Sequence, residues 1–87
     1  MTMAKVTMYC TATCPYCVMA ERLLFAKGVT EIEKIRVDLQ PELRRKMMES
    51  TGCRTVPQIY IDSYFVGAYD NLVALERSNE LGQLLND

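Results

Sequence analysis

The sequence predicts a small α/β fold, in which a mixed sheet of four strands carries helices on its faces. Short segments have the side-chain pattern of β-strands, with a period of two residues. Longer segments, whose apolar residues recur every three or four positions as in helices, separate them. These segments follow the order β-α-β-α-β-β-α, so helices separate the first three strands and a tight turn joins the last two. The chain has 87 residues, which is too short for two hydrophobic cores, and we expect residues 1–87 to form one domain.

Composition and charge argue against several classes of protein. Hydrophobic residues make up 49% of the chain and charged residues 24%, which is typical of globular proteins and not of disordered ones. The net charge of −1 gives no reason to expect nucleic-acid or membrane partners. No apolar run approaches the roughly 20 residues that span a bilayer, and residues 1–5 lack the features of a signal peptide. We therefore expect a cytoplasmic protein. We also expect it to be a monomer.

The first half of the chain has the pattern of a βαβ unit. Residues 5–10 carry bulky side chains on both faces, as a central strand does. A helix is expected over residues 15–27, since Pro15 suits a first turn and Gly28 suits the position after a helix end. Residues 32–38 form a second strand whose charged residues are typical of a sheet edge. Because one helix connects them, the two strands should be parallel.

The second half continues with a helix and a hairpin. Pro41 opens the helix and Gly52 ends it. Residues 58–61 are a third strand, and a two-residue turn at Asp62-Ser63 leads into the fourth strand over residues 64–66. The sheet should therefore end in an antiparallel pair.

A last helix is expected after the hairpin. Asp70 is a residue type that commonly caps a helix N-terminus. Apolar residues recur at helical spacing from Leu72 to Leu85, and a break near Ser78-Asn79 is compatible with the pattern. With the two earlier helices, this gives three or more helices around the sheet.

The candidate reactive site is Cys14-Pro15-Tyr16-Cys17. If the helix starts at Pro15, Cys14 lies at its N-terminal tip and Cys17 lies almost one turn further along the same face. Free N–H groups and the positive end of the helix dipole favour a thiolate at Cys14. The motif therefore predicts a nucleophilic sulfur with a second thiol in reach, while a metal site and a structural disulfide remain alternatives at this stage.

Two further cysteines bear on the metal alternative. We expect Cys10, at the end of the first strand, to be a buried apolar side chain, and Cys53 to be a partly exposed thiol in a loop. Four thiolates from Cys10, Cys14, Cys17 and Cys53 would be enough for zinc. Structural zinc sites, however, usually show two short cysteine pairs, and the chain has one such pair and no histidine. We therefore expect no metal.

A second conspicuous segment is Thr55-Val56-Pro57, directly before the third strand. Proline cannot donate to a ladder and so belongs at the start of a strand. Only about 5–6% of X–Pro bonds in folded proteins are cis. From the residues alone, the Val56-Pro57 bond is expected to be trans.

Three segments together resemble the dithiol glutaredoxins. They are the Cys14-Pro15-Tyr16-Cys17 motif after the first strand, the run from Arg54 to Ile61, and Val66-Gly67 shortly before Asp70. The similarity extends over almost the whole chain. It implies a thioredoxin fold, a cis Val56-Pro57 bond facing the cysteines, and an enzyme that uses glutathione as co-substrate in thiol–disulfide exchange, with no tightly bound cofactor.

The resemblance also implies a role for each site residue. Cys14 would attack disulfide-containing or glutathionylated proteins, and Cys17 would resolve the mixed disulfide. The remaining candidates would bind glutathione: Tyr16 beside it, the Val56 main chain along its cysteinyl backbone, Asp70 and Asn71 at its γ-glutamyl end, and Arg44 at its glycine carboxylate. The same groove would include Thr55, Pro57 and Gly67.

Some positions depart from the family pattern. Thr11 stands where many relatives have a lysine, and Ala68 replaces the second glycine of a common pair. Tyr69 occupies a position where a small residue or cysteine is frequent, and Asn71 replaces the second residue of an acidic pair. These changes affect the expected glutathione contacts and leave the sulfur chemistry intact.

Two other functions compete with this interpretation. One is a thioredoxin-like reductant that draws electrons from a flavoprotein, which the absence of tryptophan and the Pro-Tyr pair between the cysteines disfavour. The other is a module in which two chains share an iron–sulfur cluster through Cys14 and glutathione. Pro15 makes that alternative less favourable than the dithiol enzyme.

Overall fold

The computed structural model describes residues 5–86; residues 1–4, which fall in the segment considered as a possible signal peptide, and residue 87 lie outside that range. The predicted element order is confirmed, with the last helix divided in two. Within residues 5–86, no helix is both long and apolar enough to cross a membrane. The elements are β1 (Val6–Cys10), α1 (Pro15–Ala26), β2 (Ile32–Arg36), α2 (Pro41–Thr51), β3 (Gln58–Ile61), β4 (Tyr64–Gly67), α3 (Tyr69–Arg77) and α4 (Glu80–Asn86).

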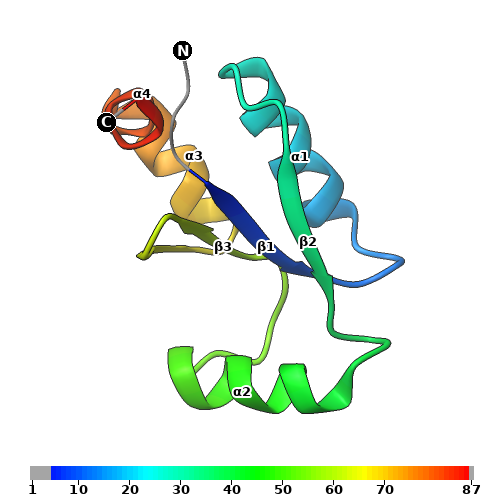
Figure 1. Ribbon diagram of the computed structural model, residues 1–87. Coiled ribbons are helices and arrows are strands. Elements are labelled where there is room, and N and C mark those ends of the chain that lie inside the picture. The colour runs from blue at the N-terminus through cyan, green and yellow to red at the C-terminus, as the bar shows by residue number, and fades with distance from the viewer. Residues whose placement is uncertain (1–4, 87) are drawn as a thin grey trace.

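The four strands form one mixed sheet in the order β2-β1-β3-β4 (Figure 1). Strand β1 runs parallel to β2 and antiparallel to β3, and β3 and β4 form the antiparallel hairpin. Met8 in β1 lies opposite Lys34 on one side and Ile59 on the other. The predicted central position of the first strand and edge position of the second are thus confirmed.

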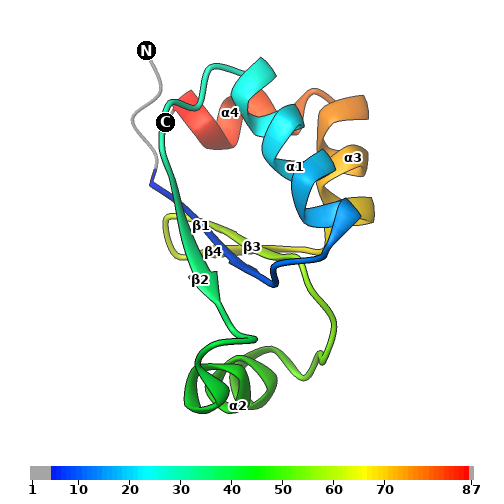
Figure 2. The same ribbon diagram turned by 90° about the vertical axis from the view of Figure 1, so that its right-hand side faces the viewer.

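Helices α1, α3 and α4 cover one face of the sheet, and α2 lies on the other side (Figure 2). Alternation in β1 turns Val6, Met8 and Cys10 toward the three-helix face, where they are buried. Helices α1, α3 and α4 supply apolar side chains to the same core. Its most deeply buried members include Met8, Leu24, Ile59, Leu72, Leu81 and Leu85.

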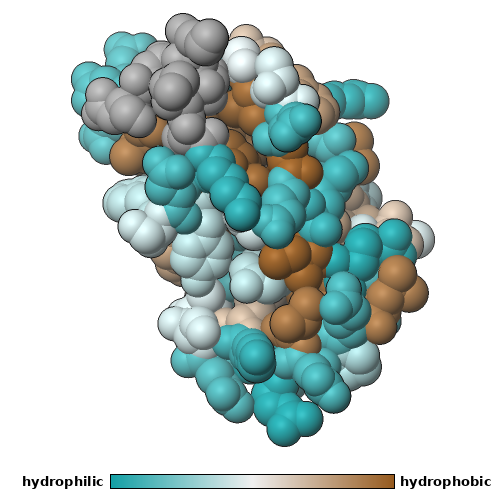
Figure 3. Space-filling model, viewed as in Figure 1, coloured by the Kyte–Doolittle hydropathy of each residue, from teal (hydrophilic) through white to brown (hydrophobic). Residues whose placement is uncertain are grey.

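The opposite face of the sheet carries a row of aromatic rings. The Tyr9 and Tyr60 rings meet edge to face with their centroids 6.2 Å apart, and Tyr60 and Phe65 lie 5.0 Å apart. Helix α2 buries Met47, and its outer surface is largely hydrophilic at the lower end of the view in Figure 3. Charged residues on this helix therefore form a solvated face.

The helix-capping residues that the sequence predicts agree with the structure, except at the start of α3. Gly28 and Gly52 have φ angles of 99° and 73°, a conformation that favours glycine directly after a helix. A break between α3 and α4 occurs at Asn79, whose φ is 65°. The predicted N-cap at Asp70 is wrong, because α3 begins at Tyr69 and Ala68 is its N-cap. Asp70 is instead in the first turn, where a carboxylate also favours the helix dipole.

Candidate active site

Cys14 is the N-cap residue of α1. Pro15 is the first helical residue, and its fixed φ and missing N–H suit that position. The sulfur of Cys14 accepts a hydrogen bond from the backbone N–H of Cys17 at 3.2 Å. This confirms the predicted location of Cys14 at the helix tip, where N–H groups stabilise negative charge on sulfur.

The loop before β3 lies against Cys14. The Cys14 thiol donates to the carbonyl oxygen of Val56 over an Sγ–O distance of 3.7 Å. The Val56-Pro57 bond is cis. The expectation drawn from the family resemblance is therefore confirmed, and the trans bond expected from the residues alone is wrong.

The two cysteines have different surroundings. Cys14 is half-buried, whereas Cys17 is buried with 5% of its surface exposed. Burial, and after it the hydrogen bond with Cys14, together raise the pKa of Cys17 to about 12. Cys14 is therefore the sulfur that a substrate can reach first.

A shallow groove of about 310 Å³ lies beside the cysteine motif. Tyr16 and Tyr69 form one aromatic part of it, with ring centroids 5.9 Å apart. Asp70 supplies a carboxylate at the start of α3. The groove is lined by Tyr16, Thr55, Val56, Pro57, Ala68, Tyr69 and Asp70.

Most of the candidate binding residues are brought together in this groove. Five of them line it directly: Tyr16, Thr55, Val56, Pro57 and Asp70. Arg44 is not among the lining residues; it is exposed on α2. The groove therefore unites residues from three separate parts of the chain but does not include the cation expected for a carboxylate.

Gly67 and Asn71 do not line the groove, but they lie close together at the start of α3, next to Ala68, which does. The Asn71 Oδ1 atom accepts a hydrogen bond from the backbone N–H of Ala68 at 3.1 Å, so it caps the start of α3. A Cβ atom at Gly67 would lie 2.6 Å from the same oxygen. The φ of Gly67 is 109°, which also favours glycine. Gly67 thus leaves the space that the Asn71 side chain occupies.

Sequence reasoning did not assign a site role to Tyr69 or Gln58. Tyr69 lines the groove. Its position between two candidate site residues, Gly67 and Asp70, could have indicated this role. Gln58 is buried, and its Nε2 atom donates to the carbonyl oxygens of Cys53 at 3.1 Å and Thr55 at 2.9 Å. These bonds hold the loop that presents Val56.

The remaining cysteines lie as expected. Cys10 is buried with 4% of its surface exposed, and burial raises the pKa of its thiol. Cys53 is exposed. Among residues 5–86, no three His, Cys, Asp or Glu side chains are grouped in a way that could hold a metal ion.

This geometry suits thiol–disulfide exchange. A half-buried sulfur lies at a helix N-terminus, a second thiol follows within one turn, and half-buried Val56 lines a groove beside them. A mixed sheet with helices on both faces carries these features. Fold and site together define a thioredoxin-fold oxidoreductase with a dithiol centre.

Comparison with known proteins identifies the family. The glutaredoxin family model matches residues 6–66. A glutaredoxin of Neisseria meningitidis is 48% identical over 84 residues, which cover 97% of this chain and 99% of that protein. The chain belongs to the glutaredoxin family. It is an enzyme of glutathione-dependent thiol–disulfide exchange, as the resemblance implied.

Solved structures agree with this assignment. The solution structure of a glutaredoxin from Brucella melitensis superposes with a TM-score of 0.84 at 43% identity, covering 99% of this chain and 92% of that one. A buckwheat glutaredoxin–glutathione complex superposes with a TM-score of 0.86, covering 94% of this chain and 76% of that one. Identity to the buckwheat protein is 22%, so that comparison shows the shared fold alone.

Proposed function

We propose that the chain uses Cys14 as nucleophile and Cys17 as resolving thiol to reduce protein disulfides and glutathione mixed disulfides. The observation that carries this proposal is the position of Cys14. Its sulfur lies at the tip of α1, next to the Val56 carbonyl and the groove, whereas the Cys17 sulfur is buried behind it. Attack therefore begins at Cys14.

In the first step, the Cys14 thiolate attacks one sulfur of a substrate disulfide. A bond forms between Cys14 and that sulfur, and the other substrate sulfur leaves as a thiolate. When the substrate is a protein disulfide, Cys17 loses its proton and attacks the Cys14 sulfur. This forms the Cys14–Cys17 disulfide and releases the substrate as a dithiol.

Glutathione then returns the enzyme to its reduced state. One glutathione thiolate attacks Cys14 and releases Cys17, which takes up a proton. A second glutathione attacks the mixed disulfide, so that Cys14 leaves as a thiolate and glutathione disulfide is formed. Two electrons pass from two glutathione molecules to the substrate. With a glutathione mixed disulfide as substrate, Cys14 alone is sufficient.

The groove supports a position for glutathione. Its cysteinyl backbone would pair with the Val56 main chain, as an added strand does, and Tyr16 would flank it. Thr55, Pro57 and Gly67 would complete the walls. Backbone N–H groups at the start of α3 would receive the γ-glutamyl carboxylate.

Charged and polar side chains would act at the two ends of glutathione. The Asp70 carboxylate would accept hydrogen bonds from the γ-glutamyl amine. The Asn71 oxygen already accepts from Ala68, so its contribution to the amine would be a second hydrogen bond. Arg44 would approach the glycine carboxylate from α2, as a long flexible cation outside the groove lining.

The proposal extends to the organisation of the chain. One core connects residues from Val6 to Leu85, which supports a single domain over residues 1–87. A reducing compartment such as the cytoplasm suits this use of the chain, because a C-x-x-C pair there is more often catalytic than a structural disulfide. We propose a monomer with no tightly bound cofactor, whose partners are glutathione and disulfide-containing or glutathionylated proteins. Elution as a monomer in size-exclusion chromatography, and a colourless protein after anaerobic purification, are the expected results.

A coupled assay tests the electron donor. Reduction of a mixed disulfide is followed through NADPH consumption, either with glutathione and glutathione reductase or with thioredoxin reductase alone. Turnover is expected only with the glutathione system. Equal or faster turnover with thioredoxin reductase would overturn the proposal in favour of a thioredoxin-like reductant, and a brown dimer would favour a cluster-binding module.

A further inference from the structure

Gln58, the first residue of β3, is a polar side chain in the interior of the protein. Among residues 5–85, it is the only polar or charged side chain that is buried, with 1% of its surface exposed. It lies opposite Tyr9 in the register of β1 and β3, and alternation places it with Tyr60 on the aromatic face of the sheet. Helix α2 lies on that side, and the loop of residues 52–57 leads from α2 back to Gln58 (Figure 2).

The amide of Gln58 ties this loop to the sheet. Its Nε2 atom donates to the carbonyl oxygen of Thr55 at 2.9 Å and to that of Cys53 at 3.1 Å. Only the NH2 end of an amide can donate to two carbonyl oxygens, so the orientation of the group is fixed. The Oε1 atom is buried and accepts no hydrogen bond from residues 5–86. Because two hydrogen bonds are offset by one unpaired acceptor, the net effect of the side chain on stability should be small.

The shorter of these bonds fixes the direction of the Val56 N–H. The Thr55 carbonyl and the Val56 N–H belong to one trans peptide unit, in which the two groups point in opposite directions. Gln58 holds the carbonyl from the interior, so the N–H points away from the interior. Within residues 5–86, this N–H donates no hydrogen bond. Since Thr55 and Val56 line the groove beside Cys14, the N–H is available to a ligand there.

We propose that Gln58 is a positioning residue that makes the groove selective for thiols with a peptide backbone, because it directs the Val56 N–H toward a carbonyl of the bound peptide. This inference rests on the proposed function, in which the cysteinyl backbone of glutathione pairs with Val56. Gln58 is buried behind the loop and acts only through it. Its effect is therefore on the recognition of glutathione and not on the reactivity of the Cys14 sulfur.

Replacement of Gln58 by methionine removes the donor but keeps a side chain of similar length. Cys53 and Thr55 are exposed residues, so water can pair with their carbonyl oxygens in place of the amide. The Thr55–Val56 peptide unit can then rotate, and the Val56 N–H no longer has a fixed direction. Gln58→Met also removes the unpaired buried oxygen, so its Tm should stay close to that of the original protein.

Two mixed disulfides with the same leaving group measure this recognition. One joins glutathione to nitrothiobenzoate, and the other joins mercaptoethanol to nitrothiobenzoate. In both, the Cys14 thiolate attacks the aliphatic sulfur and forms a bond to it, and nitrothiobenzoate leaves as a coloured thiolate. The protein carries Cys53→Ser, which removes an exposed thiol but keeps the backbone carbonyl that Gln58 contacts. The ratio of the two second-order rate constants is the preference for a peptide backbone.

We expect the original chain to prefer the glutathione disulfide, and Gln58→Met to lose about threefold to tenfold of that preference, the range for one hydrogen bond. The loss should come from the glutathione disulfide alone. The rate with the mercaptoethanol disulfide should stay unchanged, and it also reports folding, since a misfolded variant would lose both rates.

Thr51→Val is the matched control. The Thr51 Oγ1 atom accepts from the Cys53 N–H at 3.1 Å, so it ties the same loop but does not contact the Thr55–Val56 peptide unit. This variant should keep the original preference.

Amide resonances test the Val56 N–H directly. S-methylglutathione has a blocked thiol and therefore binds without exchange. In isotope-labelled protein, its addition should shift the Val56 N–H resonance of the original chain and of Thr51→Val. The shift should be much smaller in Gln58→Met at the same concentration, and an equal shift would overturn the inference.

The outcomes separate this inference from the proposed function. If the original chain shows no preference for the glutathione disulfide, the proposed glutathione site fails, and the role of Gln58 fails with it. If the original chain has the preference and Gln58→Met keeps it, only the positioning role fails. Equal loss of preference in Gln58→Met and Thr51→Val would also overturn that role, since it indicates a general effect of loop attachment. Slower reaction of Gln58→Met with both disulfides would overturn it as a general structural loss.

Discussion

The Cys14 sulfur lies 3.7 Å from the carbonyl oxygen of Val56, although 42 positions separate the two residues in the chain. This contact brings the N-terminus of α1 against the loop that starts β3. Because Val56 lines the groove, a peptide-like thiol bound there would lie close to Cys14. The relationship joins the proposed nucleophile to the groove in which we propose that glutathione binds.

Serine substitutions at the two cysteines should separate the two activities. Cys14→Ser is expected to abolish all exchange, because a serine hydroxyl does not provide a thiolate nucleophile at neutral pH. Cys17→Ser should retain reduction of glutathione mixed disulfides and lose most reduction of protein disulfides. Parallel assays with a glutathionylated peptide and a protein disulfide measure this, with Cys10→Ser as a control at a buried thiol outside the reaction.

Substantial turnover by Cys14→Ser would contradict its role as nucleophile. If Cys17→Ser lost both activities to the same extent, the division between attack and resolution would be wrong.

Gly67→Ala should destabilise the protein and weaken glutathione binding. The φ of Gly67 is 109°, and an added Cβ would lie 2.6 Å from the Asn71 oxygen, displacing the side chain that caps α3. We expect a loss of about 1–3 kcal/mol in the free energy of unfolding and a raised KM for glutathione. Urea unfolding and steady-state assays measure the two effects.

Gly82→Ala is the matched control, because a Cβ atom there meets nothing within 4 Å inside helix α4. It should stabilise the protein by about 0.4–1 kcal/mol and leave the KM unchanged. A Gly67→Ala protein as stable and as active as the original would show that Asn71 does not depend on this space.

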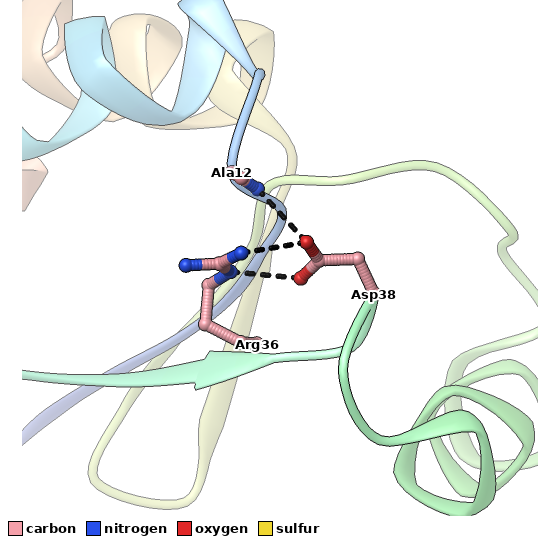
Figure 4. Close-up of polar contacts among 3 residues, drawn as sticks. All are labelled: Ala12, Arg36 and Asp38. Carbon is pink, nitrogen blue, oxygen red and sulfur yellow. Dashed lines mark hydrogen bonds and ion pairs between the residues drawn. The ribbon is translucent and has the colours of Figure 1, made fainter.

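The Arg36–Asp38 pair (Figure 4) should contribute to stability in a pH-dependent way. Arg36 lowers the pKa of Asp38 to about 2 in the folded state, compared with about 3.9 in an unfolded chain. The folded state therefore favours the charged form, and the stabilisation is complete above about pH 4 and disappears as the pH falls toward 2. Thermal unfolding should show a lower Tm for Asp38→Asn than for the original protein at pH 7, with the difference shrinking below pH 4.

The same comparison for Glu33→Gln, which affects the exposed Lys5–Glu33 pair, should show little difference at any pH. A Tm difference for Asp38→Asn that stayed constant down to pH 2 would mean that the charge of Asp38 is not its cause.

Alkylation rates should distinguish the cysteines in the reduced protein. Burial raises the pKa of Cys17 to about 12, so its thiolate is scarce at pH 8 and its sulfur is shielded. Iodoacetamide at pH 8 should modify exposed Cys53 well before Cys17, as followed by mass spectrometry of peptides. Modification of Cys17 should accelerate above pH 10, and labelling of Cys17 as fast as Cys53 at pH 8 would refute the assignment.

The location of the dithiol followed from local chemistry. Pro15 sets the first turn of a helix, and the three-residue spacing places Cys14 and Cys17 on one face whatever the rest of the chain does. Alternating and helical periodicities likewise predicted every strand and helix, because they record which side of each element faces the core. The errors were one helix cap, one peptide bond and the end of the second strand, which was expected at residue 38 and lies at Arg36.

The groove and its supports required the folded chain. Tyr69 meets Tyr16, Gln58 holds the Thr55 loop, and Asp38 reaches Ala12 across 26 positions. The first and the third contact join elements that are distant in sequence and depend on how the fold places them side by side, whereas Gln58 and Thr55 are three positions apart. Periodicity reports the environment of a residue along its own element, whereas hydrogen bonds between elements depend on distances that only packing sets. The amino-acid pattern thus accounts for the reactive sulfur, and the packed sheet accounts for the residues that surround and orient it.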